Sequence, residues 1–354
     1  MPNIEKVKFR EVSLADPFFD TLKESYAEFE EWFARKAETD AYILRNVADG
    51  LQAFLYLKLE EGPVADIAPP LNVQRCLKVG TFKIVAHGTR LGERFVKKIF
   101  DHALSSNVRH AYVTVFPEHV PLIRILERYG FTQYGTKDSP NGQELVFLKD
   151  FNILRADALL DYPVVNAVGS SKWLLSIYPA FHTRLFPDSI LRNEDARIVD
   201  DISETNSISK VYIAYMDGMT AIRPGDAVVV YRTAEVQGRA WFTSVATSLC
   251  VVQEVRQRNE FPTREAFVEY CKKNSVFSEA ELVDLYNRHV RNPMVVIRMT
   301  YNVAFRRRPT MQRLVEEVGL DREAYWGFRA LDDDAFRQIL ELGGVDEGTV
   351  IHQA

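Results

Sequence analysis

Residues 78–100, KVGTFKIVAHGTRLGERFVKKIF, are the first stretch of the chain whose pattern points to chemistry. An apolar run leads into a short loop containing Gly88 and Gly92, and the loop opens directly into an amphipathic segment. Free backbone N–H groups at a helix start, together with the positive end of the helix dipole, suit a bound diphosphate. Glycines let the chain approach such a ligand closely. A tight turn without a ligand would explain the same two glycines.

A cluster of arginines is the second such pattern. Residues 285–315 contain seven arginines, no lysine and no acidic residue, whereas residues 331–354 contain six acidic residues and one arginine. Arginine makes planar, bidentate contacts with phosphate, and the run at 306–308 follows Tyr301 and Phe305, a combination that favours nucleic-acid binding. Internal pairing with the acidic tail is the alternative. The arginines are Arg288, Arg291, Arg298, Arg306, Arg307, Arg308 and Arg313.

The composition excludes several classes of protein. A length of 354 residues suits two or three domains, and 47% hydrophobic with 26% charged residues excludes wholesale disorder. Cys76, Cys250 and Cys271 form no CxxC pair and lie in no nucleophile-like His/Asp setting, so we expect no disulfide scaffold and no metal site. The net charge of −5 is no nucleic-acid signature when averaged over the chain. We expect no signal peptide, no membrane span and a cytoplasmic location.

The first 150 residues alternate strand-like and helix-like segments, which must position the glycine loop. The mixed order with single crossover helices predicts an α+β fold around a mixed α/β sheet. Strands are expected at 7–12, 41–45, 51–59, 75–85, 111–116, 132–135 and 144–149, and helices at 18–36, 91–104 and 120–129.

Two stretches together resemble the GNAT acetyltransferases: residues 78–100, and AYVTVFPEHVPLIRILERYGF at 111–131. The loop at 87–92 lies where that family has its Arg/Gln-x-x-Gly-x-Gly/Ala loop, and Gly130-Phe131 matches its Gly-Phe pair. The resemblance covers residues from about 5 to 150 and implies acetyl-CoA as cofactor. Backbone N–H groups of a splayed strand would polarise the thioester. The implied cofactor-binding residues are Phe82, Lys83, Ile84, His87, Gly88, Thr89, Arg90, Leu91, Gly92 and Glu93.

The sequence departs from the family at its acid/base positions. Leu126 stands where the family often has a general-acid tyrosine, and His119 stands where it often has an asparagine. Tyr129, near the face of Leu126, and His119 are therefore our candidates for acid/base catalysis. Glu31 and Glu38 are candidate bases, because they lie in the segment that in this family usually borders the acceptor cleft. A core tyrosine and solvated polar residues are the alternative interpretation.

Beyond residues 151–169, expected as a partly ordered linker, the pattern changes mostly to strands. They are expected at 173–177, 210–215, 226–233, 241–255 and 294–301, and helices at 264–272, 279–290, 311–318 and 333–342. Ser278 and Glu281 predict a capping box.

This half resembles the PUA-like superfamily, especially its ASCH and EVE branches, from 170 to about 305. SKWLLSIYPAFHTRLFPDSIL at 171–191 and RPGDAVVVYRT at 223–233 carry the resemblance. It implies a small β-barrel with flanking helices in a domain at 170–354, which binds RNA or modified bases. Trp173 and Tyr212 are expected in the core. The candidate nucleic-acid-binding residues are Tyr178, His182, Arg184, Tyr231, Arg232, Arg306, Arg307 and Arg308.

Together these patterns predict a domain at 1–150 that transfers an acetyl group from acetyl-CoA to an amine of, or presented by, a nucleic acid, most readily RNA. The alternative is a non-enzymatic reader of RNA or modified bases with a degenerate acetyltransferase domain, which Leu126 favours. The sequence names neither the acceptor nor the oligomeric state.

Overall fold

The computed structural model describes residues 4–46, 50–85, 91–186, 208–236, 238–288 and 291–351. The chain divides into two compact units, unit 1 (Met1–Ile153) and unit 2 (Leu154–Ala354). Residues 154–169, expected in a linker, belong to unit 2, where β8 (Val165–Asn166) pairs with β15 (Val350–Ile351). None of the described helices is long and apolar enough to cross a lipid bilayer.

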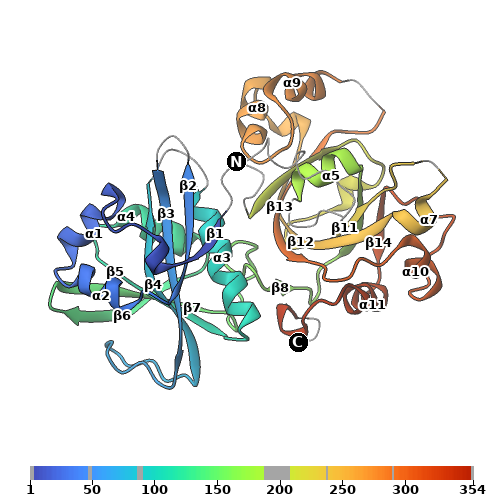
Figure 1. The fold of residues 1–354 in the computed structure, drawn as a ribbon. Coiled ribbons are helices and arrows are strands. Elements are labelled where there is room, and N and C mark those ends of the chain that lie inside the picture. Colours follow the sequence, from blue (N-terminus) through green and yellow to red (C-terminus); the bar gives the residue numbers. More distant parts are fainter. Residues whose placement is uncertain are drawn as a thin grey trace. The chain divides into compact units, whose positions relative to one another are not determined.

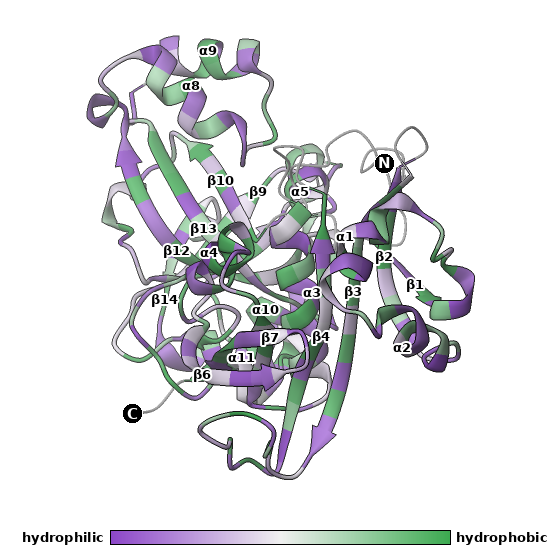
Figure 2. Cartoon of the chain, turned by 90° about the vertical axis from the view of Figure 1, so that its left-hand side faces the viewer, coloured by the Kyte–Doolittle hydropathy of each residue, from purple (hydrophilic) through white to green (hydrophobic). Residues whose placement is uncertain are grey.

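Unit 1 is built on a seven-stranded sheet in the order β1-β2-β3-β4-β5-β7-β6 (Figure 1). β4 and β5 run parallel and all other neighbours antiparallel, so the predicted mixed sheet is confirmed. Figure 2 shows apolar residues along the middle of β3 and hydrophilic residues at its C-terminal end. The strands are β1 (Glu5–Lys8), β2 (Asp40–Asn46), β3 (Gly50–Glu61), β4 (Arg75–Ile84), β5 (His110–Val115), β6 (Thr132–Ser139) and β7 (Gly142–Asp150).

An aromatic cluster covers one face of this sheet. Phe54 and Tyr56 of β3 pack there against Phe9, from η1 (Phe9–Glu11), and against residues of η2 (Pro17–Phe19) and of the helices that follow. The single helix predicted at 18–36 is wrong. The structure has α1 (Asp20–Ser25) and α2 (Phe29–Arg35), because Tyr26 leaves the helix with φ −132° and ψ 101° and turns its ring towards Phe116.

Helices α3 (Leu91–Ser105) and α4 (Val120–Arg128) belong to the opposite face. Phe82 of β4 stands opposite Leu55 on β3 and packs against Phe95 of α3, with ring centroids 6.2 Å apart. Because successive side chains of a strand alternate between faces, Leu55 lies on the face that Phe54 and Tyr56 do not occupy.

Unit 2 contains a six-stranded sheet in the order β10-β13-β12-β11-β9-β14. The predicted closed barrel is not confirmed. In the part of the chain that the structure describes, no ladder joins the edge strands β10 and β14, and closure would require that pairing. The strands are β9 (Lys172–Ile177), β10 (Ser209–Ala214), β11 (Ala227–Arg232), β12 (Val245–Gln257), β13 (Val295–Ala304) and β14 (Phe328–Leu331).

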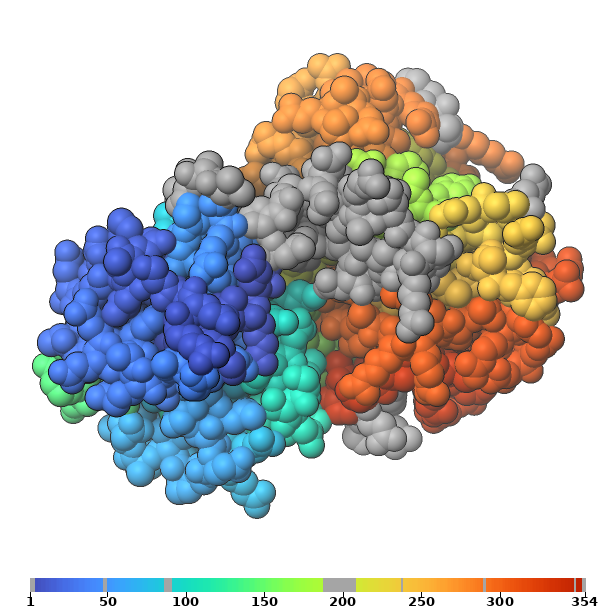
Figure 3. All heavy atoms as spheres, in the orientation of Figure 1, coloured from blue at the N-terminus to red at the C-terminus, as the bar shows by residue number. Residues whose placement is uncertain are grey.

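Helices cover both faces of this sheet, which explains why its strands are apolar on both sides. Leu314, Phe336 and Ile339 of α10 (Met311–Glu316) and α11 (Asp333–Gly343) pack on one face, and Leu185 of α5 (Pro179–Leu185) on the other. α8 (Arg264–Lys272) and α9 (Glu279–Asn287), orange in Figures 1 and 3, pack against β10 and β13 of the sheet. The capping box of Ser278 and Glu281 is confirmed. The start of the strand predicted at 241 is instead α7 (Ala240–Thr243).

Candidate active site

The two central strands of unit 1 separate in the middle of the sheet. β4 and β5 pair only from Leu77, opposite Ala111, to Val79, opposite Val113. Beyond that point β3 is the only strand that pairs with β4 among the described residues, and the ladder between them skips Gly80, which is therefore a β-bulge. A Cβ atom at Gly80 would lie 2.6 Å from Cδ1 of Tyr56, so the close approach of that ring requires glycine.

A cavity of 340 Å³ lies at this separation. On the side of β5, backbone groups of β4 beyond Val79 have no partner in the ladder, so they are available to a ligand. The wall combines aromatic, acidic and basic side chains with exposed backbone. It is formed by Leu22, Tyr26, Glu28, Phe29, Trp32, Lys36, Tyr56, Lys58, Glu60, Lys78, Val79, Gly80, Thr81, Phe82, Val113, Thr114, Val115, His119, Leu122, Lys137 and Glu144.

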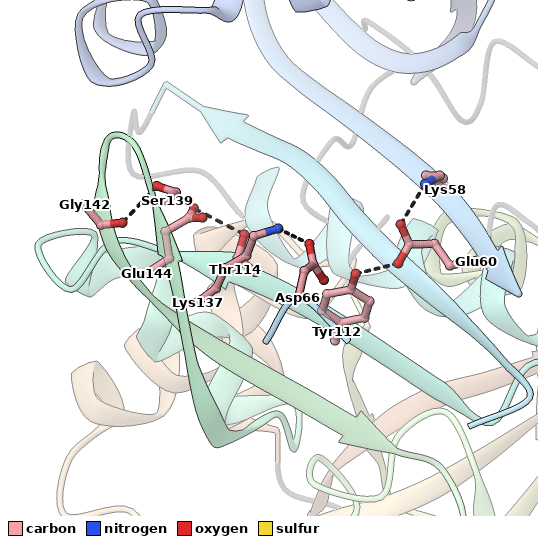
Figure 4. A network of polar contacts seen from close by, with 9 residues as sticks. All are labelled: Lys58, Glu60, Asp66, Tyr112, Thr114, Lys137, Ser139, Gly142 and Glu144. Carbon is pink, nitrogen blue, oxygen red and sulfur yellow. Dashed lines mark hydrogen bonds and ion pairs between the residues drawn. The ribbon is translucent and has the colours of Figure 1, made fainter. Parts of the chain in front are cut away.

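Glu144 is the most buried carboxylate of the cavity wall, with 6% of its surface exposed. Its Oε1 accepts hydrogen bonds from the hydroxyl of Tyr26 at 3.0 Å and from that of Thr114 at 3.2 Å. Burial, and then the adjacent Glu144 carboxylate, raises the pKa of Tyr26, so its hydroxyl keeps its proton and donates. Figure 4 shows Glu144 and Thr114 pointing toward one another from β7 and β5.

Glu60, the next carboxylate of the wall, is fully engaged by protein groups. Lys58 donates to one oxygen at 2.8 Å and the Tyr112 hydroxyl to the other at 2.6 Å (Figure 4). Burial alone would raise the pKa of Glu60, but these two hydrogen bonds outweigh it and lower the pKa. Glu60 therefore remains a carboxylate near neutral pH.

The lysines of the wall differ in their partners. Lys137 bonds Asp66 at 2.5 Å, and this hydrogen bond lowers the pKa of Asp66. Lys78 instead lies with Nζ 5.4 Å from the centroid of the Tyr112 ring. Burial, and then the charge of Lys137, lowers the pKa of Lys78.

The start of α3, predicted to hold a diphosphate, is only partly within the described residues: His87, Gly88, Thr89 and Arg90 lie outside them. Leu91 is buried, and a Cβ at Gly92 would lie 2.5 Å from Cδ1 of Ile125. Glu93 is also buried, and its Oε1 lies 3.2 Å from Nη1 of Arg128.

The residues predicted on β4 divide between the two sides of that strand. Phe82 lines the cavity, whereas Lys83 bonds the Phe18 carbonyl and the Thr21 hydroxyl and does not line it. Ile84 lies at the end of the strand, 4.0 Å through Cδ1 from the position of a Gly92 Cβ.

Of the predicted catalytic residues, the structure brings only His119 to the cavity wall. Tyr129 is fully buried at the end of α4, with Arg128 5.7 Å from its ring centroid, and Leu126 is fully buried as well. Glu31 is exposed on α2 and lines no part of the cavity, and Glu38 pairs with Arg10 at 2.5 Å. Burial raises the pKa of the Cys76 thiol to about 11, which leaves it no nucleophilic role.

A second cavity, of 620 Å³, lies in unit 2, and seven of its eighteen lining residues are aromatic. Tyr178, 71% exposed, and Tyr325, 56% exposed, stand in its wall with Tyr212, Trp326 and Arg288. Tyr212, which was expected in the core, borders the cavity and donates a hydrogen bond to the carbonyl of Ser176 at 3.2 Å. Trp173 stacks on Phe328 in the packed layer, with centroids 4.6 Å apart.

The other nucleic-acid candidates of the sheet are not gathered around this cavity. His182 is fully buried, with Nε2 2.8 Å from the Thr247 hydroxyl oxygen. Arg184 bonds the Val276 carbonyl, and Tyr231 packs on Trp326 on the other face of the sheet. Arg232 is buried and pairs with Glu235 at 2.7 Å.

The arginine run at 306–308 is partly engaged within unit 2. Arg306 is exposed and pairs with Asp346 of the acidic tail at 2.6 Å, and Arg307 donates to the Glu341 carbonyl at 2.8 Å. Arg308 is half-buried, and its charge helps lower the pKa of His182.

No family model and no curated protein matches the chain. Solved structures are similar to parts of it. A mutant of an ASCH protein from Zymomonas mobilis is 9% identical, covers 48% of this chain and 95% of its own, and has a TM-score of 0.34. An IAA acetyltransferase from Bacillus cereus is 10% identical, covers 42% of this chain and 99% of its own, and has a TM-score of 0.32. An N-acetyltransferase from Staphylococcus aureus is 10% identical, covers 42% of this chain and 97% of its own, and has a TM-score of 0.32. Because these similarities are slight, the function has to be argued from the side chains of this chain.

Glu144, Tyr26 and Gly80 are the site residues that sequence reasoning missed. Gly80 sits inside an apolar run, where an isolated strand glycine signals a bulge, and that signal was available. Tyr26 and Glu144 are 118 positions apart, and nothing in a single sequence pairs them.

Proposed function

We propose that unit 1 is an N-acyltransferase that moves an acyl group from a CoA thioester, acetyl-CoA first of all, to an amine. The observation that carries this proposal is the separation of β4 from β5 at the Gly80 bulge, which opens a cavity between two parallel strands. An extended thioester arm fits beside β4, where the backbone can bond it as a neighbouring strand would.

The residues present give the transfer a direct course. The amine nitrogen attacks the thioester carbonyl carbon, and β4 N–H groups near Phe82 bond the oxygen as it gains charge. The C–S bond then breaks and the departing sulfur takes a proton from the nitrogen. His119, exposed at the cavity wall, is the residue we assign to relay that proton.

The start of α3 suits the diphosphate of the same substrate. Backbone N–H groups at Leu91, Gly92 and Glu93 lie in the first described turn of α3, at the end of the helix whose dipole favours an anion. The Glu93 carboxylate would repel a diphosphate, but its ion pair with Arg128 offsets that charge.

We further propose that unit 2 binds a nucleic acid, RNA in the first place, and so presents the acceptor. The aromatic cavity supports this, because exposed Tyr178 and Tyr325 offer ring faces for stacking and Arg288 offers a charge. Arg306 adds a phosphate-binding group at the surface, in competition with Asp346.

A non-enzymatic acyl-CoA-binding protein is the second candidate. The burial of both Leu126 and Tyr129 favours it, because no tyrosine of α4 reaches the cavity as a general acid. Thermal unfolding with acetyl-CoA, followed by detection of free CoA thiol with n-butylamine or total RNA as acceptor, separates the candidates. A raised Tm with amine-dependent thiol release supports the acyltransferase. A raised Tm without release supports the second candidate, and an unchanged Tm contradicts both.

RNA binding is tested on the full chain with fluorescently labelled single-stranded RNA over a series of salt concentrations. Asp346→Asn frees Arg306 and should steepen the slope of log K against log salt by about 1 unit. Tyr178→Ala should cost about 1–3 kcal/mol if a base stacks on the ring. Absence of binding at low salt would contradict the nucleic-acid part of the proposal while leaving the acyltransferase part standing.

A further inference from the structure

Glu144 differs from the other carboxylates of the unit 1 cavity in the hydrogen-bond donors it has. Two neutral hydroxyls, those of Tyr26 and Thr114, donate to its Oε1. No side chain within the described ranges forms an ion pair with it, although only 6% of its surface is exposed. By comparison, Glu60 has Lys58 and Tyr112, and Glu28 lies at the exposed rim with Asn141 at 3.0 Å.

The natural partner of Glu144 is held away from it. Lys137 stands directly opposite Glu144 in the ladder of β6 and β7, but its ammonium bonds Asp66. Asp66 lies in the 62–74 segment between β3 and β4, which is fastened to β6 by reciprocal backbone hydrogen bonds of Ala68 and Thr136, 2.8 and 2.9 Å long. Figure 4 shows Asp66 between Lys137 and the Tyr112–Glu60 pair.

A buried carboxylate without a cation is costly unless a ligand supplies the cation. The surrounding wall offers an organic cation the rings of Tyr26, Phe29 and Trp32, whereas the Tyr56 ring already has the ammonium of Lys36 5.3 Å from its centroid. The Oε1 atom is fixed by its two hydroxyl donors, so the carboxylate is oriented before a ligand arrives.

We propose that Glu144, oriented by Tyr26 and Thr114, is the binding site for an alkylammonium group, and that the acceptor of unit 1 is an aliphatic amine. That the acceptor is an aliphatic amine rests on the proposed acyltransferase function. An exocyclic amine of a base is not protonated at neutral pH and gains no attraction from Glu144. The α-amine of an aminoacyl group or a protein amine is attracted, so the proposal favours these two as acceptors. Glu144 thereby acts as a specificity residue for the charged amine, whose extra proton passes through His119 to solvent before the neutral nitrogen attacks the thioester.

Direct binding to the full chain tests this without relying on turnover. The ligands are n-butylammonium chloride and its neutral, similarly sized analogue 1-pentanol, measured by calorimetry and by saturation-transfer NMR. Glu144→Gln keeps the size and the acceptor oxygen for Tyr26 and Thr114 but removes the charge. Glu127→Gln, which changes an exposed carboxylate of α4 that does not line the cavity, is the matched control.

We expect n-butylammonium to bind the wild-type chain and the Glu127→Gln variant alike, and Glu144→Gln about tenfold or more weakly. The affinity for 1-pentanol should be the same in all three. Equal binding of n-butylammonium by wild type and Glu144→Gln, or no binding by wild type, overturns the proposal. The acetyl-CoA-dependent rise in Tm, measured on the same samples, reports separately on the acyltransferase function, so that function can fail while the ammonium site stands.

Discussion

Lys137 and Glu144 face each other across β6 and β7 without forming an ion pair, because Asp66 holds the lysine ammonium at 2.5 Å. Opposite charges at directly opposed positions of an antiparallel pair normally attract. Here a carboxylate from the 62–74 segment competes successfully, and Glu144 is left with hydroxyl donors in the cavity wall. The charge state of the candidate acceptor site is thus governed by a residue that does not line the cavity.

Asp66→Asn should therefore weaken alkylammonium binding although Asp66 does not line the cavity. The freed Lys137 would turn to Glu144 and occupy the site as an internal cation. We expect n-butylammonium to bind about tenfold more weakly, measured by calorimetry. Combining Asp66→Asn with Lys137→Met removes the competing cation and should restore binding. A double variant as weak as the single one would contradict this account.

Gly80→Ala should destabilise unit 1, because the new methyl group would lie 2.6 Å from the Tyr56 ring. Overpacking of this kind costs about 1–3 kcal/mol, and moving the ring would also distort the cavity wall. Thermal unfolding should show the lowered Tm. In the double variant with Tyr56→Leu the two costs should sum to less than their separate values, whereas strict additivity would mean that the ring does not cause the loss.

Hydrophobic periodicity predicted most elements of both units. The helix at α3 and the strands at β3, β4 and β12 have long regular patterns, so their types were evident. The apolar spacing continues through Tyr26 and so predicts one helix in place of α1 and α2; only the tertiary contacts of Tyr26 with Phe116 and Glu144 reveal the break. β14 has only four residues, too few to show a hydrophobic pattern. The closed barrel is not confirmed, because the local sequence does not determine whether the edge strands of a sheet pair with each other.

The site was less predictable than the fold. Family resemblance pointed to His119 and Phe82, which line the cavity, but also to Tyr129, which the fold buries. His119 precedes α4 and Tyr129 follows it, and a helix pattern alone does not say which end of the helix reaches the cavity. The sequence predicts only that Glu144 begins a strand, because its role depends on Tyr26 and Thr114, which lie on elements distant in the sequence.

Gly92→Asp should abolish the rise in Tm caused by acetyl-CoA, because it places negative charge at the start of α3. The structure adds a complication: any Cβ there would lie 2.5 Å from Cδ1 of Ile125. The variant is therefore best made together with Ile125→Val, which removes that methyl group. Gly92→Ala with Ile125→Val is the control with bulk and no charge, and it should keep the greater part of the Tm rise. A normal rise in the aspartate variant would show that the diphosphate lies elsewhere.

His182 should make unit 2 less stable as the pH falls below neutrality. Burial, followed by the charges of Arg232 and Arg308, lowers the pKa of this imidazole from 6.5 to about 3. Between those two values the unfolded chain takes up a proton that the folded chain does not. The free energy of unfolding therefore falls with falling pH, by up to about 1.4 kcal/mol for each pH unit below 6.5.

His182→Gln removes this titration while keeping a side chain able to bond the Thr247 hydroxyl. We expect the variant to be less stable than wild type at pH 7 and to lose less stability between pH 7 and pH 5. The unfolding transition of unit 2 can be followed by tryptophan fluorescence, because Trp173, Trp241 and Trp326 belong to that unit and only Trp32 to unit 1. His110→Gln, in unit 1, should leave the pH dependence of that transition unchanged. Parallel curves for wild type and His182→Gln would mean that His182 takes up its proton in the folded state at the same pH as in the unfolded chain.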